Sequence, residues 1–264
     1  MDFTRKKYRG LIRSLKAGGY EPLTLTGYLR GGKPDKYVIL RHDVDRLPYN
    51  SLAVARIEKE EGMKGSFYFR AVPESWDEDV IRKISAMGHE VGYHYESLAT
   101  CGGDVDAAYE DFLKNLRRLR EIVPVTTICM HGSPRSPYDS RDIWKSRSYR
   151  DSGIEGEPYF DVDFSDVFYL TDTGRRWDGF KVSLRDRVEG FQDRWRDRGL
   201  VFHSTGDILS ALSDGRLPRH VMINSHPQRW TDSLVPWLNE CLVQNAKNVV
   251  KGFMVSRRQN RLPR

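Results

Sequence analysis

The sequence predicts an α/β fold in which mostly parallel strands curl into a barrel. Short apolar runs of strand length alternate with helical segments of about ten residues or more, which is the pattern of βαβ units. Ionisable residues follow the ends of these runs, as they do in parallel barrels whose chemistry gathers at the carboxyl ends of the strands. The chain has 264 residues, a length that suits one barrel domain better than two small ones.

The strands are predicted from runs rich in β-branched and aromatic residues. The clearest run is Tyr37–His42, which lies between Pro34 and Pro48. The other strands are expected at 65–69, 89–95, 125–131 and 221–225, with weaker candidates at 158–164, 167–171 and 201–203.

Helices are predicted where apolar residues recur with helical spacing, and Gly62 and Gly88 are typical stop signals after two of them. The expected ranges are 4–16, 51–62, 77–87, 106–123, 205–212 and 234–255. We therefore expect a single domain over 1–264. It has an N-terminal helix and lead-in over 1–36, a barrel over 37–230, and a closing helix with a basic tail over 231–264.

Composition excludes several classes of protein. The chain has 43 Lys and Arg residues against 37 Asp and Glu, a net charge of +6, and the two signs are interspersed, so no nucleic-acid partner is expected. Cys101, Cys129 and Cys241 form no C-x-x-C pair, which argues against a disulfide framework or a structural zinc cluster. We see no signal peptide and no apolar stretch of membrane-spanning length, so we expect a cytoplasmic protein without a membrane span.

Two carboxylates follow the first strand. Asp43 and Asp45 are two residues apart, so in a strand they point to the same side. They repel each other unless a cation or a proton separates them. Such a pair suits one base and one metal ligand, whereas the structural alternative is a surface turn in which Arg46 pairs with either acid.

Histidines follow three later strands. His94 and Glu96 share one face, and His131 precedes a turn rich in glycine and proline. Imidazole and carboxylate groups together suit zinc or a similar divalent ion. His226 stands directly before Pro227 at the end of the late strand. It is the best candidate for a general acid, because an unperturbed imidazole has a pKa of roughly 6.5.

These motifs, in this order, resemble the polysaccharide deacetylase family, carbohydrate esterase family 4. Its first motif is T-F-D-D-G, with D-V-D in a variant branch, and this chain has Asp43-Val44-Asp45. Its second motif begins G-H-E-x-G-x-H and matches Gly88–His94. The resemblance spans 37–230. It implies a distorted (β/α) barrel and a hydrolase that uses a divalent metal, zinc or alternatively manganese or cobalt, to remove acetyl groups from sugars.

The resemblance also implies residue roles. Asp43 would be the catalytic base, Asp45 and His94 metal ligands, and His226 the catalytic acid. Position 98, where the family has a second histidine ligand, holds Leu98. His131 is the preferred replacement for the third ligand, and Glu96 is the alternative.

Several residues are candidates for substrate contacts. The family motif R-x-P-Y occurs as Arg135–Tyr138, so Arg135 is expected either to support Asp43 or to match by accident, with His131–Pro134 in that structural place. Asp172–Trp177 loosely resembles the family segment D-x-x-D-W, and Asp172 and its arginines are candidate sugar or phosphate contacts. The rings of Tyr95, Trp177 and Trp230 are candidates for stacking on a sugar, with core packing as the structural alternative.

The predicted function is hydrolysis of an acetyl or similar small acyl group, such as formyl, from an amino sugar or glycan precursor. The alternative is a catalytically inactive protein that binds a glycan or a nucleotide sugar on the same barrel. A basic protein associated with nucleic acid is a third possibility, and it would need a clustered patch that the sequence does not show.

Overall fold

The computed structural model describes residues 1–133, 136–177, 188 and 190–245. Within these residues, seven strands form one sheet in the order β5-β4-β3-β2-β7-β6, with β1 also paired to β2, and every pairing is parallel. The strands are β1 (Glu21–Leu23), β2 (Tyr37–Val44), β3 (Ser66–Phe69), β4 (Glu90–Tyr95), β5 (Ile128–Met130), β6 (Phe168–Thr171) and β7 (His220–Ser225).

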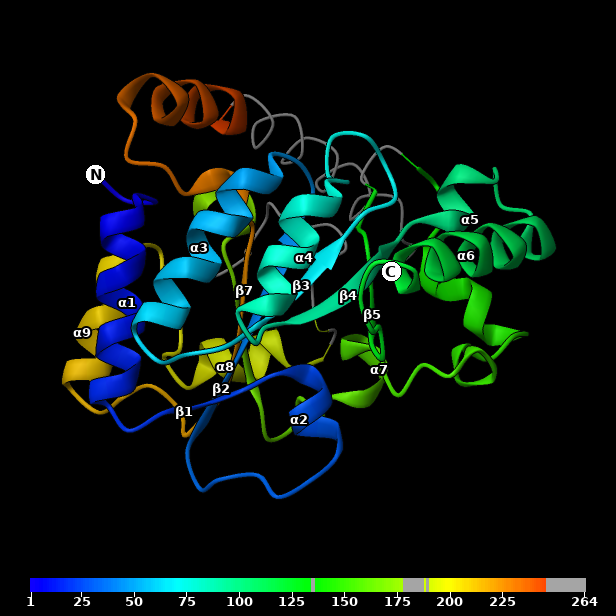
Figure 1. Ribbon diagram of the computed structural model, residues 1–264. Coiled ribbons are helices and arrows are strands. Elements are labelled where there is room, and N and C mark those ends of the chain that lie inside the picture. The colour runs from blue at the N-terminus through cyan, green and yellow to red at the C-terminus, as the bar shows by residue number, and fades with distance from the viewer. Residues whose placement is uncertain (134–135, 178–187, 189, 246–264) are drawn as a thin grey trace, which may run out of the picture.

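Helices alternate with the strands, as the spacing of apolar residues predicts. From left to right in Figure 1, α9, α1, α3, α4 and α6 lie side by side along one face of the sheet. The α-helices are α1 (Arg5–Ala17), α2 (Leu25–Leu29), α3 (Pro48–Glu60), α4 (Glu78–Ala86), α5 (Ser97–Thr100), α6 (Val105–Arg120), α7 (Pro158–Asp161), α8 (Gln192–Asp197) and α9 (Thr205–Ser213). Short 3-10 helices lie at Ser140–Lys145, Tyr149–Ser152, Thr173–Arg175 and Pro227–Arg229.

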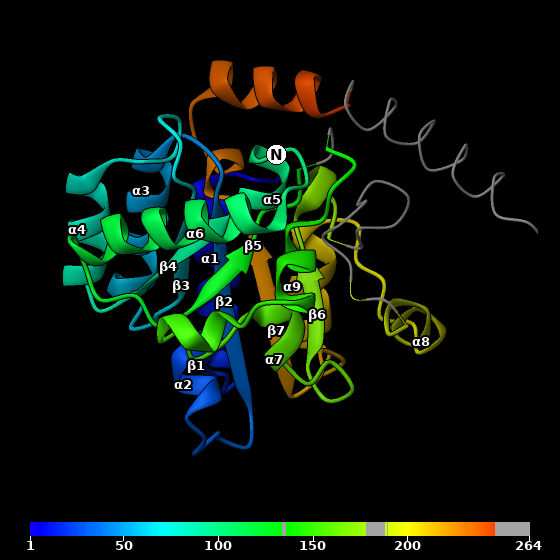
Figure 2. The same ribbon diagram turned by 90° about the vertical axis from the view of Figure 1, so that its right-hand side faces the viewer.

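The sheet curls into a half-barrel, and β5 and β6 form its edges (Figure 2). This confirms the predicted class, a distorted (β/α) barrel of mostly parallel strands. All eight residues of β2 are buried, because neighbouring strands pair with both of its edges and helices cover the sheet. The burial of Arg41, His42 and Asp43 within so apolar a strand is the first sign of a functional site.

Two predicted strands are absent from the structure. The segment expected as a strand at 158–164 begins with the helix α7, because the Glu157 carboxylate caps its first turn by accepting from the Tyr159 amide and Pro158 occupies the first position. Residues 201–203 form no strand either. The closing helix is present over 234–245, and the rest of its predicted range lies outside the described residues.

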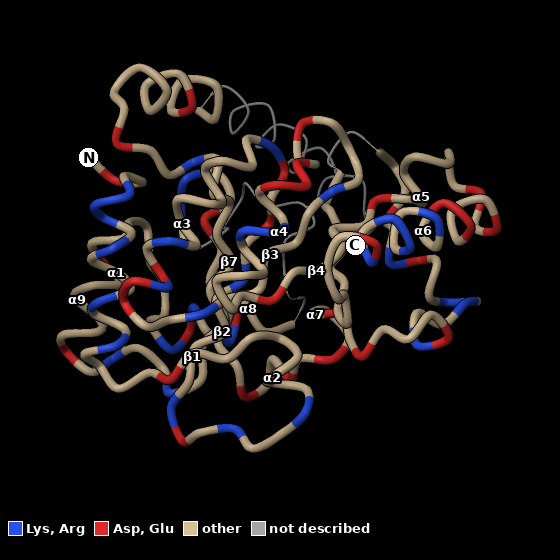
Figure 3. Tube along the Cα trace, viewed as in Figure 1, with Lys and Arg blue, Asp and Glu red and all other residues tan. Residues whose placement is uncertain are grey.

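Charged residues of both signs are interspersed over the helices and loops (Figure 3). This agrees with the mild net charge of +6. Among the described residues, no helix is both long enough and apolar enough to cross a bilayer.

Candidate metal centre and acid–base site

The candidate site lies at the carboxyl ends of the strands. Five of the strands each deliver an ionisable side chain there, and parallel pairing brings the carboxyl ends of all of them to the same end of the sheet. The side chains follow or close β2, β4, β5, β6 and β7 respectively: Asp43 and Asp45, His94, His131, Asp172, and His226.

Three of the predicted metal ligands converge. Asp45 Oδ1 lies 3.7 Å from His94 Nε2 and 3.4 Å from His131 Nε2. One ligand atom of each residue lies within 4.8 Å of the other two. A carboxylate with two imidazoles is a common set for zinc. The structure therefore brings together the ligand set preferred on sequence grounds, with His131 as its third member.

A hydrogen bond fixes the tautomer of His94. Its Nδ1 donates to the Cys129 carbonyl oxygen over 2.9 Å, which leaves the Nε2 lone pair facing the two aspartates. Burial lowers the pKa of His94 to about 4, in spite of the nearby carboxylates. The ring is therefore neutral at pH 7, as a metal ligand must be.

The orientation of His131 depends on Glu96. Glu96 Oε2 accepts from His131 Nδ1 over 2.9 Å, and Arg70 holds the other carboxylate oxygen with bonds of 2.9 and 2.7 Å. Burial raises the pKa of Glu96, but His131 and Arg70 outweigh it and lower the value to about 2. A permanent carboxylate behind the imidazole is the usual support of a metal-binding histidine. Glu96, the alternative third ligand, thus supports the ligand instead.

One buried atom indicates that a cation fits here. Asp45 Oδ1 is buried and accepts no hydrogen bond from the described residues, whereas Oδ2 of the same carboxylate accepts from Gln228 Nε2 over 3.0 Å. Burial raises the pKa of Asp45, but His131, His226 and His94 together bring it below its usual value. An ionised, buried and unsatisfied oxygen that faces two imidazole nitrogens is the environment expected of a metal ligand.

A second group of atoms could also hold a metal: Asp43, His94 and Cys129. It suits a cation less well than the first, because both oxygens of Asp43 already have partners. Arg41 donates to Oδ1 over 2.9 Å and to Oδ2 over 2.7 Å, and Asn224 donates to Oδ2 over 3.0 Å. We therefore prefer the group that contains Asp45.

Arg41 controls the charge of Asp43, and Asn224 helps to hold its orientation. Burial raises the pKa of Asp43, but the bidentate guanidinium of Arg41 outweighs it, with smaller contributions from His94 and His226, and lowers the value to about 2. Asp43 is therefore ionised at neutral pH and held in a single orientation.

His226 is paired with Asp172 at the other side of the site. Its Nδ1 lies 2.6 Å from Asp172 Oδ1, and its Nε2 lies 3.9 Å from Asp45 Oδ2. Burial and Arg229 lower the pKa of His226, but the Asp172 carboxylate and Asp45 outweigh them and raise the value above the ordinary one. Asp172 thus favours the protonated imidazole and directs its second nitrogen toward the candidate metal ligands.

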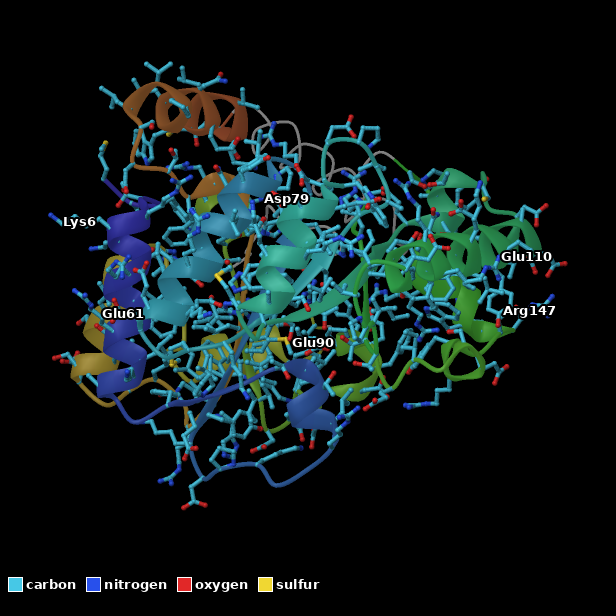
Figure 4. The ribbon with its side chains drawn as sticks, viewed as in Figure 1. Lys6, Glu61, Asp79, Glu90, Glu110 and Arg147 are labelled. Carbon is cyan, nitrogen blue, oxygen red and sulfur yellow. The ribbon has the colours of Figure 1, made fainter. Side chains whose placement is uncertain are left out.

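The opposite end of the sheet carries a different kind of carboxylate. Glu90, at the first position of β4, is labelled in Figure 4 near α2. It accepts from Thr26, Ser66 and Thr127. Glu110 and Arg147 are labelled at the outer edge of the molecule in the same view. Glu90 is therefore a carboxylate that can be changed at the end of the sheet opposite the candidate site.

Several predicted substrate contacts need correction. The rings of Tyr95, Trp177 and Trp230 are at most 1% exposed, so they pack in the core and offer no face to a sugar. Trp230 donates to Asp172 instead, and Trp144 donates to the Tyr95 hydroxyl.

The predictions for Asp172 and Arg135 have different outcomes. Asp172 is fully buried under His226 and Arg229, so it positions other side chains and is not reached by substrate. Arg135 lies outside the described residues. Arg41 provides the support for Asp43 that had been expected of it.

Leu98 does not face the site. It is buried in a small separate cluster with Ala108 and Ile143, between α5 and the elements that follow it. Leu98, which stands where the family has a histidine ligand, therefore does not pack against the candidate metal centre.

Sequence reasoning missed four residues of the site: Arg41, Asn224, Gln228 and Arg229. A charged residue in the middle of an apolar strand was a signal for Arg41, because a buried guanidinium needs an acidic partner. The remaining contacts join residues far apart in the chain, and no local pattern marks them.

A cavity of about 580 Å³ lies beside the site and contains none of the candidate ligands. The hydroxyl of Tyr159, on the wall of this cavity, accepts from Arg41 Nη2 over 3.3 Å. Arg41 also donates to Asp43, and it thereby connects the cavity wall to the site. The chemistry of the ligand set, and not this cavity, therefore locates the site.

Neither the family models nor the curated proteins compared with this sequence give a match. Among solved structures, the chain is similar to a mutant and the wild type of a CE4 family pseudoenzyme from Bacillus anthracis. Each is 14% identical over 83% of this chain, with TM-scores of 0.42 and 0.41. It is also similar to the Xyl-CE4 domain of a multidomain xylanase from the hindgut metagenome of Trinervitermes trinervoides. That domain is 10% identical over 86% of this chain and 85% of its own, with a TM-score of 0.38.

This chain covers 64% and 62% of the two Bacillus anthracis structures, which is less than two thirds of their length. Its activity has to be argued from its own residues.

Proposed function

We propose that this chain is a metal-dependent hydrolase that removes an acetyl or similar small acyl group from an amino sugar or glycan precursor. One observation carries the proposal: Asp45 faces the Nε2 atoms of His94 and His131 through one oxygen and Nε2 of His226 through the other. Metal-assisted hydrolysis of an amide needs a cation site and a proton donor within reach of one substrate. The resemblance of the motifs to polysaccharide deacetylases supplies the substrate class.

Asp45, His94 and His131 would hold the metal, and their nitrogen and oxygen donors suit zinc, with manganese or cobalt as alternatives. A divalent cation bound there supplies polarisation of an acyl carbonyl and a lowered pKa for a bound water.

Asp43 is the proposed base. Its carboxylate is ionised, because Arg41 holds its pKa near 2, and it lies 3.8 Å from His94 Nε2, beside the ligand set. Arg41 and Asn224 fix its orientation, so accepting a proton requires no rearrangement of the side chain.

His226 is the proposed acid. Asp172 raises its pKa, so at neutral pH a larger fraction of the ring carries the proton than in a free histidine. Its Nε2 faces the site and would donate to the leaving nitrogen. An amine leaves readily only when it is protonated, so this donation decides whether the C–N bond breaks.

One observation favours the second candidate function, an inactive protein that binds a glycan or a nucleotide sugar. Both oxygens of Asp43 accept hydrogen bonds, and its low pKa makes it a weak proton acceptor. On that interpretation the ligand set and His226 would bind a sugar without turnover.

Acetate release by the metal-loaded protein separates the two functions. We expect release from N-acetylated amino-sugar oligomers or nucleotide-linked amino sugars in the presence of zinc, manganese or cobalt. Asp43→Asn and His226→Ala should each lower kcat by roughly 10²–10⁴-fold while the protein keeps its metal. Glu90→Gln, a carboxylate change at the opposite end of the sheet, is the control. A wild type that binds metal and sugar but releases neither acetate nor formate would establish the binding protein instead.

A further inference from the structure

The closing helix has an attached face and an exposed face. Residues 234–245 are helical and lie at the upper end of the molecule in Figure 1, in orange to red, on the side of the carboxyl ends of the strands. The proposal below concerns this helix. It goes beyond the hydrolase and does not depend on it.

Three side chains attach the helix to the body. Trp237 Nε1 donates to the Asp2 carbonyl oxygen over 2.6 Å, and Glu240 pairs with Arg46 over 2.5 Å. Gln244 is buried. These positions are spaced three and four residues apart, so they form a single face of the helix.

The exposed face is apolar. Leu234, Val235, Leu238 and Leu242 have exposed fractions of 56%, 76%, 45% and 69%. At about 100° per residue they occupy roughly a third of the helix circumference, away from the attached face. In Figure 3 this helix is almost entirely uncharged, unlike the helices along the sheet. A contiguous apolar patch on an otherwise charged surface is typical of an interaction site.

Basic residues gather in the same part of the sequence. Between Leu234 and Arg264 the sequence has six basic residues and one acid, Glu240. This balance of +5 accounts for most of the net charge of +6. The six basic residues are Lys247, Lys251, Arg257, Arg258, Arg261 and Arg264.

We propose that this helix docks the protein on an anionic membrane surface, with Leu234, Val235, Leu238 and Leu242 buried among the lipids. An interfacial helix needs an apolar face to insert and a positive charge to be drawn to the headgroups. The described helix supplies the apolar face, and the sequence after residue 245, which lies outside the described residues, supplies the basic residues. A nucleic acid would need only the charge, and a second copy of the chain would need only the apolar face. Docking in this way would place the strand ends, with the candidate site, toward the membrane side of the protein.

Co-sedimentation with vesicles tests the proposal. We expect wild type to bind vesicles of phosphatidylcholine with phosphatidylglycerol, to bind pure phosphatidylcholine weakly, and to be released from the anionic vesicles by high salt. The matched variants are Leu238→Glu and Asn239→Glu, which place the same charge at neighbouring exposed positions. Leu238→Glu should bind vesicles about tenfold more weakly than Asn239→Glu, because only Leu238→Glu also removes an apolar side chain that would be buried among the lipids.

Several results would overturn the proposal. One is a wild type that does not bind anionic vesicles, or an equal loss of vesicle binding in Leu238→Glu and Asn239→Glu. Another is a wild-type dimer, seen by light scattering, that binds no vesicles and that Leu238→Glu converts to a monomer. The apolar face would then serve self-association. Equal retention of single-stranded RNA by both variants without vesicle binding would show that only the charge matters. Because no assay here uses metal or turnover, a negative result leaves the hydrolase proposal untouched.

Discussion

At the scale of single residues, the candidate site depends on which nitrogen of each histidine carries the proton. The Cys129 carbonyl orients His94, and the Glu96 carboxylate orients His131, so both rings direct their Nε2 atoms toward Asp45. Two histidines on different strands need two separate partners for this, and both partners are present. The hydrogen bonds to Cys129 and Glu96 that orient the two histidines therefore support a metal site as much as the ligands themselves do.

Replacing Glu96 tests this interpretation. Glu96→Gln removes the carboxylate behind His131 and leaves the three ligands in place. We expect metal affinity to fall by about 10–100-fold, measured by competition with a chelating dye. Glu90→Gln, at the opposite end of the strand that Glu96 follows, should bind metal as wild type does. Unchanged affinity in Glu96→Gln would mean that Glu96 does not orient a ligand.

Asp172 should set the pH range of catalysis through His226. Its carboxylate raises the pKa of the imidazole, and a general acid works only while it is protonated. Activity should therefore be lost as the pH rises through the raised pKa. In Asp172→Asn the alkaline limb of the kcat/KM profile should move to lower pH. A variant with reduced kcat but an unshifted alkaline limb would contradict this role.

At the scale of elements, β5 and α7 are joined by a buried acid. Glu157 accepts from the Met130 amide over 3.0 Å and from the Tyr159 amide over 2.6 Å. Burial nevertheless raises the pKa of Glu157 from 4.5 to about 7. Between these values the folded protein binds a proton that the unfolded chain releases, so the free energy of unfolding falls as the pH rises across this window.

This linkage predicts a stability change of up to about 3 kcal/mol between about pH 4.5 and pH 7. Urea unfolding of the metal-free protein at several pH values measures it. Because other groups titrate as well, the useful quantity is the difference between wild type and Glu157→Gln, which should lose less stability than wild type as the pH rises. Parallel pH profiles for the two proteins would contradict the raised pKa.

The short helix α5 contains Leu98 and places its side chain in a small separate cluster. Leu98 packs with Ala108 and Ile143, and its side chain is turned away from the ligand set. Leu98→His should therefore give no gain in metal affinity and should cost about 2–4 kcal/mol of stability. Leu98→Met is the control for volume. Tighter metal binding by Leu98→His would show that this position reaches the site.

The sequence predicted most elements because their signals are local. The strands around Tyr37–His42 and 221–225 are apolar runs, and the helices near 51–62 and 77–87 have regular apolar spacing. The segment at 158–164 was mistaken because its aromatic residues favour a strand, while the capping carboxylate of Glu157 and Pro158 start a helix. Capping geometry outweighs propensity over so few residues.

At the scale of the whole molecule, the parallel half-barrel explains why residues far apart in the chain meet. Strand ends at Asp43, His94, His131 and His226 come to one edge because every pairing is parallel. The position of these residues was therefore predictable from the strand order alone. The burial of Tyr95, Trp177 and Trp230 was not, because the inward or outward direction of a ring depends on the curl of the sheet and on the helices packed against it.

The most direct test of the central claim is the metal content of the purified chain and its variants. We expect about one divalent ion per chain in wild type and a loss of that ion in Asp45→Asn, His94→Ala and His131→Ala. Asp43→Asn should retain it, because Arg41 and Asn224 already occupy that carboxylate. Wild type that takes up no zinc, manganese or cobalt, or full metal content in folded His131→Ala, would contradict the metal centre described here.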